Sequence, residues 1–347
     1  MGQRTERDTI VIGLTPGDPA GIGPEIALRA WQSRLLHQLP PFAVYAAPEL
    51  LRERSQTLGL LAPLKVCQSP EEAISCFSEA LPVIPIPLAA APVPGKPDNA
   101  NASATIAAID RAVADCAAGR SDAVVTNPIA KAVLYEAGFQ HPGHTEYLAE
   151  LSGRFWPAQP RTAVMMLTCE HLRIIPLTVH VALNDVPALI TRKLIIQTAH
   201  VAAASLASDF GIDKPRIAIA GLNPHAGESG ALGREERDII APAVLDLQRD
   251  GLTVSGPYPA DTMFHAAARA RYDVAIAMYH DQALIPVKTL AFDEGVNITL
   301  GLPFVRTSPD HGTAFDIAAE GRASAKSLIA AIQLAGIVAR RRAKLHT

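Results

Sequence analysis

Aromatic residues and cysteines are scarce in this chain of 347 residues. Phe, Trp and Tyr together make up 5% of it, although 49% of the residues are hydrophobic. A core built mainly from Ala, Ile, Leu and Val suits the layers of a parallel α/β protein better than an antiparallel sandwich. The four cysteines have no Cys-x-x-Cys spacing, which favours thiols in a reducing compartment over a disulfide framework or a zinc site.

An excess of charge of one sign is also lacking, since 31 Lys and Arg residues face 34 Asp and Glu residues. This balance, with no basic stripe, argues against a nucleic-acid partner. No apolar run is long enough to cross a bilayer, because the longest one, Leu81 to Pro94, is interrupted by five prolines. The N-terminus has no signal-peptide pattern. We therefore expect a cytoplasmic protein without a membrane partner.

What the chain does contain is a repeated alternation of short apolar runs, polar loops and segments of helix length. This order is typical of a parallel sheet flanked by helices. The expected strands are Thr9–Leu14, Phe42–Ala46, Asp122–Val125, Leu172–Val179, Arg216–Ala220 and Asp273–Met278. The expected helices are Pro24–His37, a helix from Asn101 or Ser103 to Ala118, Val186–Phe210 and Arg234–Arg249.

Three of the eleven histidines, His180, His225 and His280, stand at or just beyond the carboxyl ends of expected strands. Ligands of open α/β sheets bind outside those ends, so three imidazoles placed there can hold one divalent ion. Their wide spacing matches no local metal-ligand motif. From the residues alone, helix capping or packing therefore remains an open alternative for each of them.

Polar residues downstream extend this pattern. Lys288, Asn297 and Arg306 are spaced along an otherwise apolar stretch, and a Lys with an Arg is a common pair for phosphate and carboxylate groups. Either side chain could equally lie on the surface. The segment His311–Asp316 places a glycine between a histidine and an aspartate, which suits a loop against a flat ring.

Long motifs in the chain resemble the 4-hydroxythreonine-4-phosphate dehydrogenase family of vitamin B6 biosynthesis. The resemblance covers nearly the whole chain. The motifs that carry it are GLTPGDPAGIGPEI, TNPIAKAVLYEAGFQHPGHTEYLAE, GLNPHAGESGALGREE, GPYPADTMFH and AMYHDQALIPVKTLAFDEGVNITLGLPFVRTSPDHGTAFDIA.

The resemblance implies an isocitrate and isopropylmalate dehydrogenase-like α/β fold with two lobes and an active-site cleft between them. We expect residues 1–125 and 290–347 to form the nucleotide-side lobe. Residues 126–289 are expected to form the lobe for metal, substrate and dimerisation. The family also implies a homodimer whose metal site takes ligands from both subunits.

The resemblance also implies roles for individual residues. His180, His225 and His280 match the family's metal ligands, with Zn²⁺, Co²⁺ or Mg²⁺ as the ion. His144, Thr145, Lys288, Asn297 and Arg306 match positions that bind substrate. NAD or NADP is expected at His311, Gly312, Thr313 and Asp316. Lys288, Asp281 and Asp261 are the candidates for proton transfer or support of the site.

The activity implied is oxidation of 4-phosphooxy-L-threonine, followed by decarboxylation of the product. Paralogous dehydrogenases that act on threonate or erythronate 4-phosphate, or on a terephthalate-derived dihydrodiol, remain alternatives. A metal-independent phosphate acyltransferase and a non-catalytic phosphate-binding protein are more distant ones.

Overall fold

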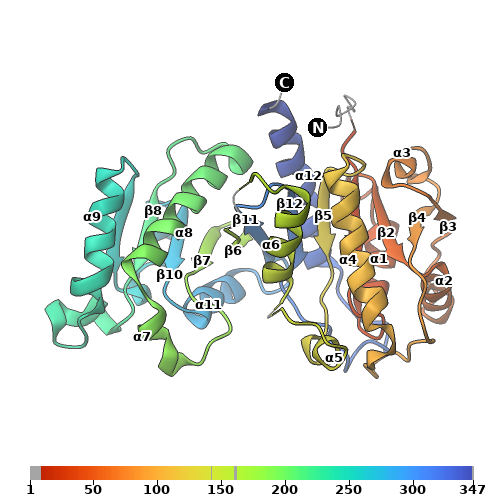
Figure 1. Cartoon of the computed structure of the whole chain (residues 1–347), viewed down its shortest axis with the longest axis horizontal. Coiled ribbons are helices and arrows are strands. Elements are labelled where there is room, and N and C mark those ends of the chain that lie inside the picture. The colour runs from red at the N-terminus through yellow and green to blue at the C-terminus, as the bar shows by residue number, and fades with distance from the viewer. Residues whose placement is uncertain (1–8, 142, 160–161, 346–347) are drawn as a thin grey trace. The chain divides into compact units, whose positions relative to one another are not determined.

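The computed structural model describes residues 9–141, 143–159 and 162–345, which fall into two compact units (Figure 1). The first unit comprises residues 1–161 and 302–345, and the second comprises residues 162–301. These units differ from the expected lobes in residues 126–161, which fall in the first unit, and in residues 290–301, which fall in the second. In the first unit, strand β5 (Ala123–Thr126) pairs with β1 (Ile12–Thr15) and β12 (Val305–Pro309). In the second unit, strand β11 (Val296–Leu300) pairs with β6 (Val164–Cys169).

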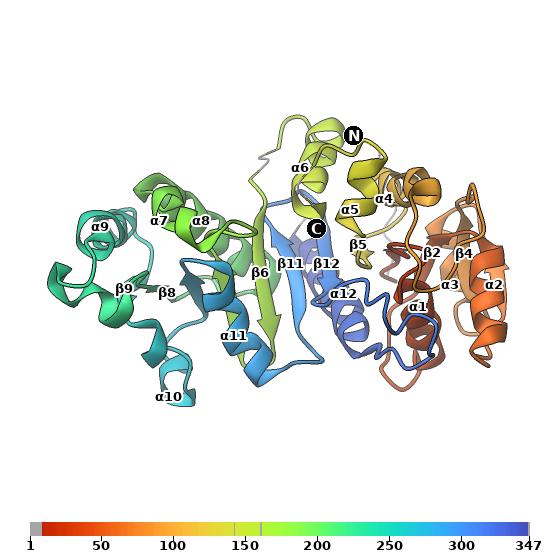
Figure 2. The same ribbon diagram turned by 90° about the horizontal axis from the view of Figure 1, so that it is seen from below.

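The sheet of the first unit is parallel throughout, in the order β3-β4-β2-β1-β5-β12. Helices α4 and α6 cover one face of it, and α1 and α12 cover the other (Figure 2). The remaining strands are β2 (Phe42–Ala46), β3 (Leu64–Val66) and β4 (Leu81–Pro85). The helices are α1 (Gly23–Gln32), α2 (Pro48–Thr57), α3 (Ala73–Cys76), α4 (Ala102–Ala117), α5 (Lys131–Glu136), α6 (His144–Phe155) and α12 (Lys326–Leu345).

The sheet of the second unit has the order β11-β6-β7-β10-β8-β9. Strands β7, β10, β8 and β9 are parallel, as expected, but β6 is antiparallel to both β7 and β11. A two-residue turn joins β6 to β7, and so short a connection permits only a hairpin. The strands are β6 (Val164–Cys169), β7 (Leu172–Pro176), β8 (Ile217–Ala220), β9 (Val254–Tyr258), β10 (Val274–Ala277) and β11 (Val296–Leu300).

Helices also cover both faces of this second sheet (Figure 2). Helices α8 (Arg192–Ser205) and α9 (Ala241–Arg249) pack together on one face, and α11 (His280–Leu290) packs on the other. Ala283 and Val287 of α11 are buried against Ile174 and Ala275 of the strands. Burial of these aliphatic side chains holds α11 in place, and with it the first residue of that helix, His280. Short α7 (Val186–Leu189) and α10 (Ala266–Arg269) complete the unit.

The expected strands all form, although several helices have other bounds. The helix expected over Pro24–His37 ends at Gln32, where Ser33 donates its hydroxyl to the carbonyls of Arg29 and Ala30. The helix expected over Val186–Phe210 consists of α7, α8 and a wider turn at Leu206–Phe210. Within the described part of the chain, no helix has the length and apolar character needed to cross a membrane.

Candidate active site

Three histidines follow three neighbouring strands of the second unit. The order β7-β10-β8 is parallel, so the carboxyl ends of these strands lie at one edge of the sheet. His180 follows β7, His280 follows β10 and His225 follows β8. All three residues therefore follow the edge of the sheet at which α/β proteins bind ligands.

His180 and His280 lie together, with ring centroids 5.6 Å apart. The backbones before them are joined, since Leu177 donates its N–H to the Ala277 carbonyl (2.8 Å) and the Thr178 hydroxyl donates to the Met278 carbonyl (2.8 Å). His180 itself has a left-handed φ of 52°, which non-glycine residues adopt at a cost in free energy. The turn after β7 is therefore held in a strained form that brings this ring to His280.

Gln282 links the ends of β10 and β8. Its side-chain oxygen accepts from the Met278 N–H (2.7 Å), and its side-chain nitrogen donates to the Gly221 carbonyl (2.9 Å). The Nδ1 atom of His280 lies 2.7 Å from a carboxylate oxygen of Asp281. A carboxylate at one ring nitrogen fixes the orientation of a histidine and leaves Nε2 for a metal ion.

His225 stands in an unusual loop after β8. His225, Ala226, Glu228 and Ser229 all have positive φ, between 41° and 57°. The buried carboxylate of Glu236 holds the start of this loop by accepting from the Asn223 N–H (2.7 Å). Strained backbone held by buried contacts is often found at functional sites.

The His225 ring is accessible, with a side chain 66% exposed, and Glu228 lies 2.7 Å from its Nδ1. This hydrogen bond, followed by the charge of Glu228 and that of Asp261, raises the pKa of His225. Each of His225 and His280 thus has a carboxylate at Nδ1, which fits histidines that bind a metal ion through Nε2. The single chain nevertheless brings only His180 and His280 together, and among the described residues no three His, Cys, Asp or Glu side chains are arranged to hold an ion.

A groove runs beside α11. Asp261 and Asp281 both line it, together with apolar side chains that include Phe264 and Ile285. Lys288 lies seven residues after Asp281, on the same side of the helix, with its ammonium group 5.4 Å from the centre of the Phe292 ring. Asn297 lies on β11 and has a buried side-chain oxygen with no hydrogen-bond partner.

The first unit contains the other expected substrate residues. Arg306 on β12 is buried and donates to the Thr126 hydroxyl at the end of β5 (2.7 Å). His144 and the partly exposed Thr145 form the first turn of α6. Burial, followed by the charges of Arg306 and Lys131, lowers the pKa of His144 well below its usual range. Burial also lowers the pKa of Arg306 to about 10, and the nearby Glu146 carboxylate acts in the opposite direction.

The segment expected to bind a nucleotide lies against the loop after β1. Thr313 accepts the Ile22 N–H (3.0 Å) through its carbonyl. His311 and Thr313 are partly buried, whereas Gly312 and Asp316 are exposed. A side chain at Gly312 would meet no atom within 4 Å, so open space lies beside this backbone.

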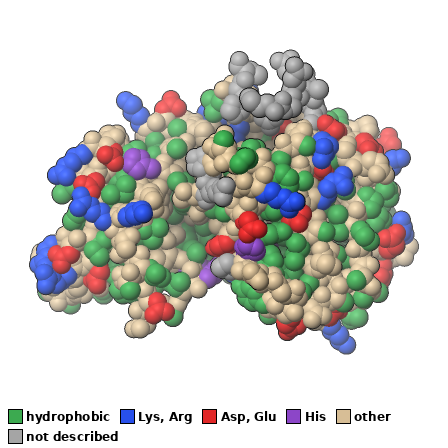
Figure 3. Space-filling view, in the orientation of Figure 1, with side chains coloured by type: hydrophobic (Ala, Val, Ile, Leu, Met, Phe, Trp, Pro, Cys, Tyr) green, Lys and Arg blue, Asp and Glu red, His purple; other side chains and the backbone are tan. Residues whose placement is uncertain are grey.

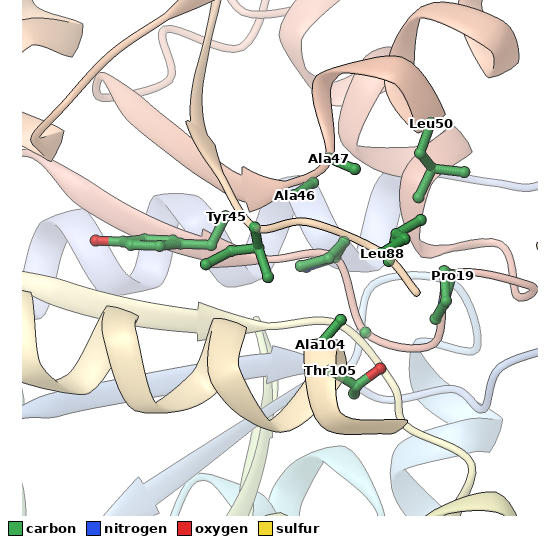
Figure 4. A pocket seen from close by; sticks show the side chains of 11 residues that line it. Pro19, Tyr45, Ala46, Ala47, Leu50, Leu88, Ala104 and Thr105 are labelled. Carbon is green, nitrogen blue, oxygen red and sulfur yellow. The ribbon is translucent and has the colours of Figure 1, made fainter. Parts of the chain in front are cut away.

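A narrow slot lies at the carboxyl ends of β1, β2 and β4 (Figure 4). Pro19, Ala47, Leu50 and Leu88 line it, and the Tyr45 hydroxyl points away from them. That hydroxyl donates to the buried Asp115 carboxylate (2.8 Å) instead. A slot with this lining offers little to an anion.

On the face of the molecule in Figure 3, acidic and basic side chains are interspersed.

Comparison with known proteins identifies the family. The profile of the pyridoxal phosphate biosynthetic protein PdxA family matches residues 38–335. The chain belongs to this family. It is 54% identical over 332 residues to the 4-hydroxythreonine-4-phosphate dehydrogenase of Methylorubrum populi, covering 95% of each chain.

Solved structures agree with this assignment. The 4-hydroxythreonine-4-phosphate dehydrogenase of Klebsiella pneumoniae has a TM-score of 0.82 and 38% identity, covering 96% of this chain and 99% of the other. A terephthalate 1,2-cis-dihydrodiol dehydrogenase from Burkholderia xenovorans has a TM-score of 0.61 and 29% identity, covering 95% and 98% of the two chains. The α/β class and the family expected from the sequence are thereby confirmed.

Two residues near His144 were not singled out in the sequence. Lys131 begins α5 and Glu146 lies in the first turn of α6. Both lie beside Gly143, the residue before His144. Lys131 is part of a motif that carries the family resemblance, but only the fold brings it to the start of α6.

Proposed function

We propose that this chain is an NAD(P)-dependent and divalent-metal-dependent 4-hydroxythreonine-4-phosphate dehydrogenase. The observation that carries the proposal is the position of His180, His225 and His280 after three adjacent parallel strands, in a chain of the PdxA family. The name of its relatives supports the substrate.

The proposed substrate is 4-phosphooxy-L-threonine. Oxidation removes a hydride from C3, which passes to the oxidised nicotinamide, and a proton from the C3 hydroxyl. The product, 2-amino-3-oxo-4-phosphooxybutanoate, is a β-keto acid. It loses carbon dioxide to give 3-amino-2-oxopropyl phosphate, which serves pyridoxine 5′-phosphate formation.

His180, His225 and His280 are the residues proposed to hold the divalent ion, which is Zn²⁺, Co²⁺ or Mg²⁺. A divalent ion at this place supplies Lewis-acid chemistry, which lowers the pKa of a nearby hydroxyl group. The family resemblance implies a homodimer with metal ligands from both subunits, and we propose that a second copy of the chain completes the set. The exposure of His225 supports this arrangement.

The chain's own residues then have separate tasks. Asp281 and Glu228 orient the imidazoles of His280 and His225 through Nδ1. Because Asp281 already serves His280, Lys288 and Asp261 remain the better candidates for moving the substrate's proton. Thr145, Asn297 and Arg306 orient the substrate, and the loop of His311, Gly312, Thr313 and Asp316 binds NAD or NADP.

Two measurements on purified protein test the proposal: its metal content, and its reduction of NAD⁺ or NADP⁺ with 4-phosphooxy-L-threonine. Replacing His280 by Ala is expected to remove both the bound metal and turnover while the fold is retained. The control is His200→Ala, since His200 lies on the exposed side of α8, where it contacts Asp250. Full activity without a divalent ion would refute the metal-dependent scheme.

A panel of substrates separates this proposal from its alternatives. Preferred turnover of threonate or erythronate 4-phosphate, or of a terephthalate dihydrodiol, would assign a paralogous activity. Formation of an acyl phosphate without any nicotinamide reduction would assign a phosphate acyltransferase. Phosphate binding with no reaction would assign a binding protein.

A further inference from the structure

A cluster of charged side chains surrounds the N-terminus of α6 in the first unit. The Lys131 ammonium nitrogen lies 3.3 Å from the point that a Cβ atom would occupy on Gly143. A carboxylate oxygen of Glu146 lies 3.4 Å from the same point. Because Gly143 has no side chain, the Lys131 ammonium group and the Glu146 carboxylate can both lie close to the start of the helix.

Two cationic side chains and one carboxylate belong to this cluster. Lys131 and Arg306 both act on the His144 ring, and Glu146 acts on Arg306. Burial is the first cause that lowers the pKa of His144, and these two cations are the next. The first amides of a helix of 12 residues add further positive potential at the same place.

This arrangement leaves a polar atom without a partner. The Nε2 atom of His144 is shielded from solvent and has no hydrogen bond. A buried polar atom without a partner costs about 1–3 kcal/mol. An anion bound at this place would accept a hydrogen bond from the Nε2–H tautomer of His144 and remove this cost.

We propose that Lys131 is a phosphate ligand, which acts with Arg306 and His144 to select a phosphorylated substrate. The assignment rests on the proposed function, because it identifies the anion with the substrate's phosphate. Phosphate suits the cluster better than a carboxylate does, because it carries more charge and more acceptor oxygens. Lysine binds phosphate as a point charge, arginine binds it as a fork, and helix N-termini bind it through their amides.

The first test measures binding of inorganic phosphate to the whole protein by calorimetry. Lys131→Met is expected to weaken this binding about tenfold, equal to about 1.4 kcal/mol. Lys65→Met is the matched control, since Lys65 is an exposed lysine on β3 of the same unit. Lys131→Arg, which keeps the charge, is expected to restore most of the affinity, and a purely structural role would not produce this pattern.

The second test uses turnover. Lys131→Met is expected to raise KM for 4-phosphooxy-L-threonine about tenfold with little change in kcat, because a contact made equally in ground and transition states affects binding alone. KM for the nicotinamide is expected to stay unchanged.

The possible failures are distinct. Unchanged phosphate affinity in Lys131→Met would overturn the assignment, whatever the enzyme's activity. Weakened phosphate binding in a protein that does not oxidise 4-phosphooxy-L-threonine would keep Lys131 as a phosphate ligand and refute the proposed function. If Lys131→Met does not fold, Lys131→Gln takes its place with the same expected result.

Discussion

A single carboxylate, that of Asp273, fixes the start of two strands in the second unit. It accepts the backbone N–H of Arg216 (2.7 Å) just before β8, and it also receives the Arg216 side chain at 3.0 and 3.1 Å. The Asp273 N–H in turn donates to the Arg216 carbonyl (2.8 Å) just before β10. These contacts fix the alignment of β8 with β10 at the start of both strands. His225 and His280 follow the opposite ends of the same two strands.

The pH dependence of stability follows from the same contacts. The side-chain hydrogen bond from Arg216 is the main cause that lowers the pKa of Asp273. Since the pKa is lower in the folded protein than the unfolded value of about 3.9, the carboxylate stabilises the fold above that value and loses its effect as the pH falls through the folded pKa.

Asp273→Asn is therefore expected to lower the free energy of unfolding by about 1–2 kcal/mol at neutral pH. The difference from the wild-type protein should narrow as the pH falls below about 4. Urea denaturation at a series of pH values measures both quantities. A difference that stayed constant down to low pH would mean that the charge of Asp273 is not what stabilises the fold.

At the scale of elements, one buried arginine joins two loops of the first unit. Arg54 on α2 donates to the Pro19 carbonyl (3.2 Å) in the loop after β1 and to the Ala318 carbonyl (3.1 Å) just after the His311–Asp316 segment. Glu25 on α1 holds the same region by accepting the Ala323 N–H (3.1 Å). The loop proposed to bind the nucleotide is thus positioned by residues that need not touch a ligand.

Arg54→Met keeps much of the aliphatic volume but removes both hydrogen bonds. It is expected to raise KM for NAD⁺ or NADP⁺ several-fold and to leave phosphate affinity unchanged, because the loop loses its anchor while the α6 cluster stays intact. Steady-state kinetics with each substrate varied in turn, together with phosphate calorimetry, provide the check. An increase in KM for 4-phosphooxy-L-threonine alone would contradict a role at the nucleotide loop.

The sequence predicted elements better than it predicted the contacts between them. Each run that leads to His180, His225 or His280 is a strand in the structure, because an apolar run between turn residues is a strong local signal. The strands β6 and β11 and the reversed direction of β6 were not anticipated, since strand direction depends on tertiary pairing. Lys131 was missed for a similar reason, because its place beside Gly143 is set by the fold and by no local pattern.

For the whole molecule, the decisive feature is that the candidate residues are divided between the two units. The second unit contains the three histidines, Asp261, Asp281, Lys288 and Asn297. The first unit contains His144, Thr145, Arg306 and the 311–316 loop. Each unit has its own buried core, so loss of a ligand group in one unit should leave the fold of the other intact.

Two variants separate the contributions of the two units. Arg306→Ala is expected to retain bound metal but to weaken binding of the phosphorylated substrate by about 1.5–3 kcal/mol, the usual worth of a hydrogen bond to a charged group. His280→Ala is expected to lose metal but to bind inorganic phosphate as the wild-type protein does. Metal analysis and phosphate calorimetry on the same preparations measure both properties, and turnover should fall in each variant.

Loss of metal from Arg306→Ala would mean that the two units do not hold their ligands independently. An unchanged KM for the phosphorylated substrate in that variant would place the substrate's phosphate elsewhere.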